Sequence, residues 1–209
     1  MTPLDAARLR TALRRLGQAR PGPGVLELPD DLSPTDALEA ILAVISVLEP
    51  PGTSGSSPKP GGRTGAVRIH TDGAARGNPG PAGIGVLLAE PDGRVVERLH
   101  RYVGEATNNV AEYLALLAGL QRAYELGYRE AELFSDSELL VRQLEGRYRV
   151  RHPKLRPLFE AAQERIARFK EFRIRHVPRA ENAEADALAN LGIDEGRPRP
   201  ARPAAEPEP

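Results

Sequence analysis

Four acidic residues stand in four separate motifs of this sequence, and their side chains have the chemistry of a metal-ion site. They are Asp72 in IHTDGAARGNPGPAGIG, Glu112 in TNNVAEYLALLAGL, Asp136 in LFSDSELLVRQL and Asp186 in HVPRAENAEADALANLG. A hard divalent cation such as Mg²⁺ prefers oxygen ligands in near-octahedral geometry, and carboxylates from different elements can converge to supply them. Phosphoryl transfer assisted by two metal ions requires such convergence. The set therefore predicts one site built from four elements.

Three of these acids also have ordinary structural explanations. Asp72 precedes Gly73, and an Asp-Gly pair is common in Asx-turns. Asp136 ends an apolar strand pattern and opens a helical one, so it could be the N-cap of that helix. Asp186 lies beside the apolar face of the last helical pattern and could be a solvated neighbour of that face. Each acid alone is weakly informative, whereas four ordered motifs are specific.

Glu112 lies one turn into a predicted helix that begins near Thr107, Asn108 and Asn109. A capping arrangement would explain the acid, because the helix dipole favours negative charge in the first turn. That explanation leaves the doubled Asn without a role. Two amides beside a helix N-terminus can read sugar hydroxyls and base edges in a shallow minor groove, where the 2′-hydroxyl distinguishes RNA from DNA.

The four motifs carry a family resemblance. The stretches DGAARGNPGPAGIG, TNNVAEY, SDS and ENAEAD, in this order, resemble the type I ribonuclease H family, in particular its short bacterial and archaeal form, over residues 66–192. The resemblance implies an endoribonuclease that cleaves the RNA strand of RNA/DNA hybrids by two-metal hydrolysis, leaving 5′-phosphate and 3′-hydroxyl ends. The implied cofactor is a pair of Mg²⁺ ions, with Mn²⁺ as a possible substitute.

The resemblance also assigns roles to individual residues. Asp72 would bridge both metal ions, and Asp186 would help to hold the ion that activates water. Glu112 and Asp136 would hold the ion that stabilises the leaving 3′-oxygen. Glycines after Asp72 would allow the backbone to approach a phosphodiester closely. The expected substrate-binding residues are Gly73, Asn78, Asn108 and Asn109.

His176 precedes Asp186 by ten residues. At that offset many family members carry a mobile-loop histidine that assists proton transfer or product release, and a proton carrier with a pKa near neutrality suits that role. In this chain the following segment is stiffened by Pro178 rather than rich in glycine. His176 could instead be an ordinary semi-buried residue that ends the last strand, and both interpretations stay open.

The predicted fold class is α/β, a ribonuclease H-like fold with a mixed five-stranded sheet, three antiparallel strands followed by parallel ones, and helices on both faces. A Pro-Asp-Gly turn joins the second and third strands as a hairpin. We expect Gly127 to end the first helix of this region and Gly192 to end the last. The strands are expected at 66–72, 82–90, 94–103, 130–136 and 172–177, and the helices at 108–127, 137–146, 153–169 and 182–192.

Composition divides the chain into four parts. We expect a small helical segment of unknown role at 1–50, a Pro/Gly/Ser linker at 51–65, the catalytic domain at 66–192 and a disordered Pro-rich tail at 193–209. The chain has 29 basic and 29 acidic residues, which excludes a basic field over the whole molecule. It has no Cys, which excludes thiolate metal sites and disulfides.

Nucleic-acid affinity must therefore come from local patches. One basic run is evident, and it could be a solvated helix end or a set of phosphate contacts. It is shorter than the basic handle of several relatives. Its members are Arg142, Arg147, Arg149, Arg151, Lys154 and Arg156.

No stretch is long and apolar enough for a membrane span or resembles a signal peptide, so we expect a cytoplasmic protein without membrane contact. An RNA/DNA hybrid is the expected partner, and protein partners are not predicted. Two rival functions remain: another nuclease of the same fold, such as an exonuclease or junction resolvase, and a non-catalytic binding module. The doubled Asn and GNPG disfavour the first, and the complete acidic set disfavours the second.

Overall fold

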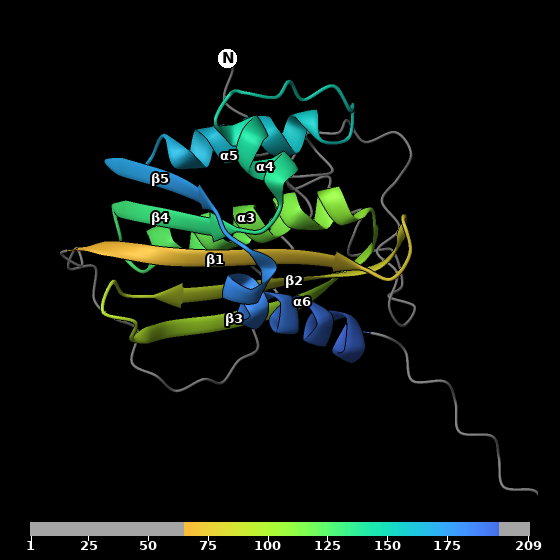
Figure 1. The fold of residues 1–209 in the computed structure, drawn as a ribbon, viewed down its shortest axis with the longest axis horizontal. Helices are drawn as coiled ribbons and strands as arrows, with labels where there is room; N and C mark the ends of the chain where they lie inside the picture. Colours follow the sequence, from red (N-terminus) through yellow and green to blue (C-terminus); the bar gives the residue numbers. More distant parts are fainter. Residues whose placement is uncertain (1–64, 197–209) are drawn as a thin grey trace, which may run out of the picture.

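The computed structural model describes residues 65–196, and its centre is a five-stranded sheet (Figure 1). The strand order is β3-β2-β1-β4-β5. The β1/β2 and β2/β3 pairs are antiparallel, whereas β1/β4 and β4/β5 are parallel, which confirms the predicted mixed sheet. The strands are β1 (Ala66–Ala75), β2 (Gly80–Ala89), β3 (Val95–Ala106), β4 (Glu130–Ser135) and β5 (Glu171–His176).

Helices cover both faces of the sheet, as predicted. Gly119 in the first helix approaches Ile69 and Val86, whereas Gly85, the neighbour of Val86, approaches the last helix. Because successive strand residues point to opposite faces, these two helices lie on opposite sides. The helices are α3 (Asn108–Glu125), α4 (Glu138–Leu144), α5 (Arg156–Ile166) and α6 (Ala183–Gly196), with a 3₁₀ turn η1 (Arg179–Asn182) before α6.

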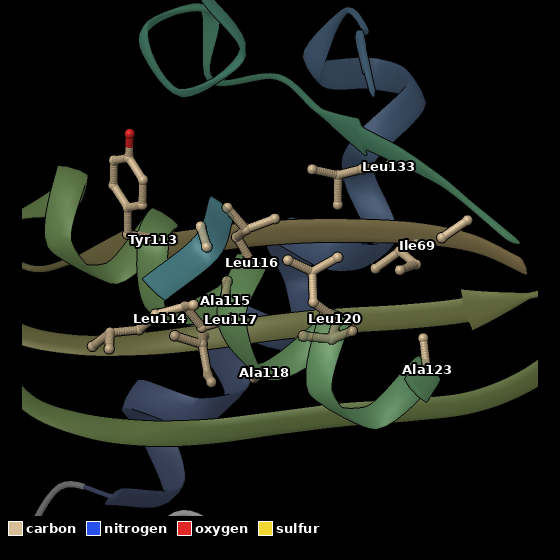
Figure 2. Close-up of a cluster of buried hydrophobic side chains, with 14 of the residues drawn as sticks. Ile69, Tyr113, Leu114, Ala115, Leu116, Leu117, Ala118, Leu120, Ala123 and Leu133 are labelled. Carbon is tan, nitrogen blue, oxygen red and sulfur yellow. The ribbon is translucent and has the colours of Figure 1, made fainter. Parts of the chain in front are cut away.

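The main hydrophobic core lies between α3 and the sheet (Figure 2). Helix α3 is rich in Leu and Ala, which are strong helix formers, and its residues 111–120 are all buried. Leu116, Leu117 and Leu120 are fully buried and pack with Ile69 of β1 and Leu133 of β4. Each such side chain contributes about 1.5 to 3 kcal/mol through burial. This packing fixes α3, and with it Glu112, over the central strand.

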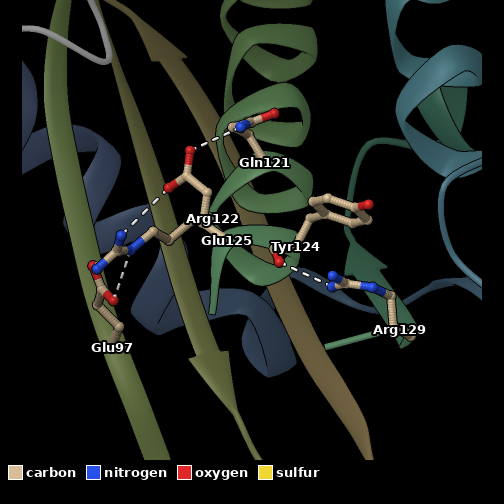
Figure 3. A network of polar contacts seen from close by, with 6 residues as sticks. All are labelled: Glu97, Gln121, Arg122, Tyr124, Glu125 and Arg129. Atoms are coloured by element: carbon tan, nitrogen blue, oxygen red, sulfur yellow. Dashed lines mark hydrogen bonds and ion pairs between the residues drawn. The ribbon is translucent and has the colours of Figure 1, made fainter. Parts of the chain in front are cut away.

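Polar contacts fix the C-terminal end of α3 (Figure 3). The Nε of Arg122 donates to both carboxylate oxygens of Glu97 on β3 at 3.0 Å. The guanidinium of Arg129 lies 3.9 Å from the ring centroid of Tyr124 and donates to the Tyr124 carbonyl oxygen. The helix then ends where expected, because Gly127 adopts a left-handed φ of 94°.

The hairpin between β2 and β3 is confirmed, and its turn is closed by the Gly93 N–H donating to the Glu90 carbonyl. Several expected boundaries are wrong: β3 continues to Ala106 rather than ending at 103, and α5 spans Arg156–Ile166 rather than 153–169. Two further differences concern β1 and α6. Strand β1 does not end at Asp72, because β1 stays paired with β2 as far as Ala75. Helix α6 does not end at Gly192 but continues to Gly196, so the expected tail cannot begin at 193.

Gly192 serves close packing rather than termination. A Cβ at this position would lie 2.6 Å from the Arg101 carbonyl oxygen, so the glycine lets α6 pass directly against the backbone of β3. The predicted N-terminal helical segment, nearly all of the linker and the rest of the tail lie outside the described residues. Among residues 65–196, no helix is long and apolar enough to cross a membrane.

Candidate active site

Asp72 lies at the centre of the sheet, two residues beyond the last β1/β4 pair, His70 with Phe134. The side chain is therefore placed where the parallel ladder ends, although β1 itself continues, so Asp72 is part of a strand rather than an Asx-turn. Only 6% of the residue is exposed. Burial, followed by the charges of Asp136 and Asp186, raises the pKa of Asp72 to about 6.

Glu112 comes from α3 and is also buried. Thr107 is the N-cap of α3, accepting a hydrogen bond from the Val110 N–H, and the first turn contains no acid. The alternative account, a capping arrangement with the acid in the first turn, therefore does not explain Glu112, although Thr107 does cap the helix. Burial raises the pKa of Glu112 well above its usual value, and the charges of Asp72 and Asp136 add to this. Its Oε2 atom has no hydrogen-bond partner.

Gly73 brings α3 and β1 together. A Cβ on residue 73 would lie 2.2 Å from both the Ala111 carbonyl carbon and the Glu112 nitrogen. Only a glycine lets the helix backbone approach the strand this closely beside Asp72. The predicted substrate-binding residue thus has a structural role in placing Glu112, and it also lines the cleft described below.

Asp136 follows β4, but it does not cap the next helix. Ser137 is the N-cap of α4, since its hydroxyl accepts from the Leu140 N–H. The Asp136 carboxylate is oriented instead by Asn182, whose Nδ2 donates to Asp136 Oδ1 at 2.7 Å and to the Thr71 carbonyl at 3.0 Å. Asn182 is 1% exposed. In the sequence Asn182 is the expected start of the last helix and part of the motif around Asp186, but nothing in its spacing reveals a partner 46 residues away.

Asp186 is half-buried on the first turn of α6, so it is not a solvated bystander. Its Oδ1 is paired with the guanidinium of Arg179 from η1. Its Oδ2 lies 3.4 Å from Nδ2 of Asn190, one turn further along α6. Both carboxylate oxygens of Asp186 therefore have partners within the chain.

These elements enclose one open cleft of about 340 Å³. All four predicted carboxylates line it, as do two of the predicted substrate-binding residues, Gly73 and Asn108. Asn78, Asn109 and His176 do not line it. The lining residues are Asp72, Gly73, Ala74, Asn108, Glu112, Asp136, Ser137, Glu138, Leu139, Arg179 and Asp186.

The predicted asparagines lie around the N-terminus of α3. The Asn108 N–H donates to Asn78 Oδ1 at 3.3 Å, so the GNPG loop is attached to the start of this helix. Asn78, Asn108 and Asn109 are all exposed. Their amides are therefore available at the rim, with only Asn108 reaching the cleft itself.

His176 ends β5, as one of the two interpretations had it, but its side chain is exposed rather than semi-buried. Its Nε2 lies 3.3 Å from the backbone carbonyl oxygen of Asp136. The imidazole ring of His176 therefore contacts the backbone of Asp136, one of the four acidic residues. Its role in proton transfer stays a prediction.

The cleft fits divalent metal ions in its donor chemistry. All its candidate ligands are carboxylate oxygens, the type that Mg²⁺ prefers, and Glu112 presents a buried oxygen without a partner. Within residues 65–196, however, no three His, Asp or Glu side chains are arranged to hold an ion directly. Of the four carboxylates, Asp186 is the one with an oxygen paired to a cation, the guanidinium of Arg179.

The raised pKa of Asp72 predicts a pH-dependent stability effect. The pKa of the Asp72 carboxyl group rises from 3.8 to about 6 on folding. Protonation of this group therefore stabilises the folded state, with full effect below pH 3.8, and this stabilisation is lost as the pH rises through about 6. In the metal-free protein, Asp72→Asn should therefore be more stable than wild type above neutral pH, by about 1 to 3 kcal/mol. The gain should shrink as the pH falls through about 6 and disappear below about 4.

Urea unfolding with a chelator, measured across this pH range, checks the effect. Glu181→Gln is the matched control, because it removes one exposed acid from η1 and should give a small difference with no such pH window. A gain from Asp72→Asn that is independent of pH would contradict the buried charge as its cause.

Comparisons with known proteins agree with this geometry. The family model described as "Reverse transcriptase-like" matches residues 70–192. Ribonuclease HI of Halobacterium salinarum is 45% identical over 64% of this chain and 67% of its own length. The crystal structure of RNase H1 from that archaeon superposes with a TM-score of 0.62, covering 63% of this chain and 99% of that one.

Two further relatives are similar. The bifunctional protein Rv2228c of Mycobacterium tuberculosis is 46% identical over 61% of this chain, which spans only 35% of that protein. LC11-RNase H1, isolated from compost by a metagenomic approach and solved in complex with an RNA/DNA hybrid, is 42% identical with a TM-score of 0.57, covering 62% of this chain and 97% of that one. Because ribonuclease HI of Halobacterium salinarum is 45% identical over two thirds of its own length, this chain belongs to the ribonuclease H family of hydrolases.

Proposed function

We propose that this protein is an endoribonuclease that cleaves the RNA strand of RNA/DNA hybrids. The observation that carries the proposal is the convergence of Asp72, Glu112, Asp136 and Asp186, from four different elements, on one open cleft. LC11-RNase H1, a relative with 42% identity, has been solved with such a hybrid bound. The open shape of the cleft suits a duplex that passes across the surface rather than a small enclosed ligand.

The four carboxylates would hold two Mg²⁺ ions, with Mn²⁺ as a possible substitute. When bound, the ions would activate a water molecule and stabilise the leaving 3′-oxygen, giving 5′-phosphate and 3′-hydroxyl ends. Asp72 is suited to a bridging position, because it lies on the central strand between the contributions of α3, β4 and α6. The hydrogen bond from Asn182 holds the Asp136 carboxylate in place.

Substrate contacts would come from the rim around the start of α3. The exposed amides of Asn78, Asn108 and Asn109 would hydrogen-bond the minor groove of the hybrid, where the 2′-hydroxyls of the RNA strand are displayed. Gly73, which lines the cleft, would contact the scissile strand through its backbone. These contacts select RNA, whereas the carboxylates alone do not.

Phosphate contacts would come from the basic run between α4 and α5. Several of its members are already paired with acids: Arg142 with Glu138, Arg147 with Glu145 and Arg156 with Glu160. Tyr148 in the same loop is 51% exposed and could stack on a base or sugar. The remaining cations, Arg149, Arg151 and Lys154, are exposed and suited to phosphates.

His176 would move a proton between the cleft and solvent. It is exposed, and its ring is attached to the backbone of Asp136 by the 3.3 Å contact. From this position it would assist departure of the product rather than bind the ions themselves.

A panel of end-blocked substrates tests the reaction directly. The full-length chain should cut the labelled RNA strand of a hybrid in Mg²⁺ and leave the DNA strand, duplex DNA and duplex RNA intact. Asp72→Asn should lose activity by about a thousandfold or more, because it removes a metal-bridging charge while keeping the side-chain shape. Cleavage of an unblocked hybrid but not of the end-blocked one would indicate an exonuclease, and wild-type turnover by Asp72→Asn would contradict the assignment of the site.

Selectivity tests the role of the asparagines. Asn109→Ala should weaken hybrid cleavage by about one to two orders of magnitude, since a hydrogen bond to a positioned substrate is worth about 1 to 3 kcal/mol. The matched control is Gln121→Ala on the same helix, whose amide donates to Glu125 far from the cleft. A hybrid with 2′-O-methyl groups around the scissile bond should resist the wild-type enzyme. Equal cleavage of methylated and unmodified hybrids would contradict recognition of the 2′-hydroxyl.

A further inference from the structure

Arg179 is a cation among the carboxylates of the cleft. It lies in η1, directly after Pro178, and its guanidinium lines the cleft together with Asp72, Glu112, Asp136 and Asp186. Its guanidinium forms an ion pair with Asp186 Oδ1. The side chain is 75% exposed, so the guanidinium reaches inward from solvent rather than being locked in a core.

The charge of Arg179 acts on the whole cluster. It opposes the rise in the pKa of Asp72 and of Glu112, and its own pKa is raised by Asp186 first and by Asp72 and Asp136 to a smaller extent. A metal cation bound at the same place would shift the pKa values of these carboxyl groups in the same direction. Arg179 thus partly neutralises the acids when no other cation is present.

Asp186 is also the carboxylate with the least free capacity to coordinate an ion. Asn182 donates to Asp136 Oδ1 and not to Oδ2, and Glu112 Oε2 has no hydrogen-bond partner. Asp186 has one oxygen on Arg179 and the other near Asn190.

We propose that Arg179 is a tethered cation that holds Asp186 in the metal-free protein and must leave it when a divalent ion binds there. The inference rests on the proposed function only in that it concerns the same metal site. Arg179 would then lower the affinity for the ion in the absence of substrate. Once released, its planar guanidinium would be free to bind a phosphate of the hybrid, for which its geometry is suited. Metal loading would thereby be favoured when substrate is present.

The test is direct Mn²⁺ binding to the full-length protein without nucleic acid, measured by calorimetry or by the paramagnetic signal of free Mn²⁺. Arg179→Gln should bind the ion about threefold to fivefold more tightly than wild type, as expected for loss of one exposed ion-pair competitor. Arg98→Gln is the matched control. Arg98 pairs with Glu184, which lies on α6 as Asp186 does, but Arg98 does not line the cleft. This control variant should leave the affinity unchanged within about twofold.

A double-mutant cycle separates displacement from a general effect of charge. If Arg179 acts by holding Asp186, the gain from Arg179→Gln should vanish in an Asp186→Asn background. If the full gain persists there, Arg179 acts only through its field and the inference is overturned. Unchanged or weaker binding by Arg179→Gln, with normal binding by wild type, overturns it as well and leaves the proposed function standing. Absence of binding by wild type and all variants would count against the metal site and therefore against the proposed function.

Discussion

The burial of Asp72 among like charges is the constraint on which the rest of the site depends. A carboxylate that is 6% exposed and faces Asp136 and Asp186 is costly to ionise, which is why its pKa rises to about 6. Glu112 experiences the same burial and the charge of Asp72 itself. Such a cluster persists because the surrounding fold is rigid enough to hold the acids together. A divalent cation bound in the cleft would offset the repulsion among these carboxylates.

The fold holds the acids together through close approach of helix and strand backbones beside Asp72. Gly73 follows Asp72 in β1 and lies against Ala111 and Glu112 of α3. Gly85 is the cross-strand partner of Asp72 in β2, and a Cβ there would lie 2.1 Å from the Ala185 carbonyl oxygen, next to Asp186. Two glycines beside one aspartate thus bring in two helices from opposite faces, each at the residue before its own acid. The hydrophobic core behind α3 then keeps this arrangement in place.

Features encoded by local chemistry were predictable from the sequence. Residue type and spacing predicted the Pro-Asp-Gly hairpin and the left-handed conformation of Gly127. They also predicted the order of the strands and helices around the four acids. The structure confirms each of these features. The end of α6 was not predictable in this way. Gly192 has the same sequence signature as a helix terminator. Its actual role is to let α6 pack against the backbone of Arg101 on β3, a contact that only the assembled sheet reveals.

The same distinction applies to the partners of the acids. Ser137 rather than Asp136 caps α4, a shift of one residue that frees a carboxylate for the cleft. The bonds from Asn182 to Thr71 and Asp136 span 111 and 46 residues, and no local pattern predicts contacts of that range. The sequence indicated which groups do chemistry, whereas the tertiary structure decides which neighbours orient and neutralise them.

The measurement that tests the buried carboxylate site most directly is the dependence of thermal unfolding on Mg²⁺ at fixed pH above neutrality. An ion that binds only the folded state raises stability with the logarithm of its concentration once the site begins to fill. The unfolding midpoint of wild type should therefore rise steadily with added Mg²⁺, and that of Asp72→Asn should rise far less. An equal rise in both proteins, or no rise in wild type at millimolar Mg²⁺, would contradict a metal site centred on Asp72.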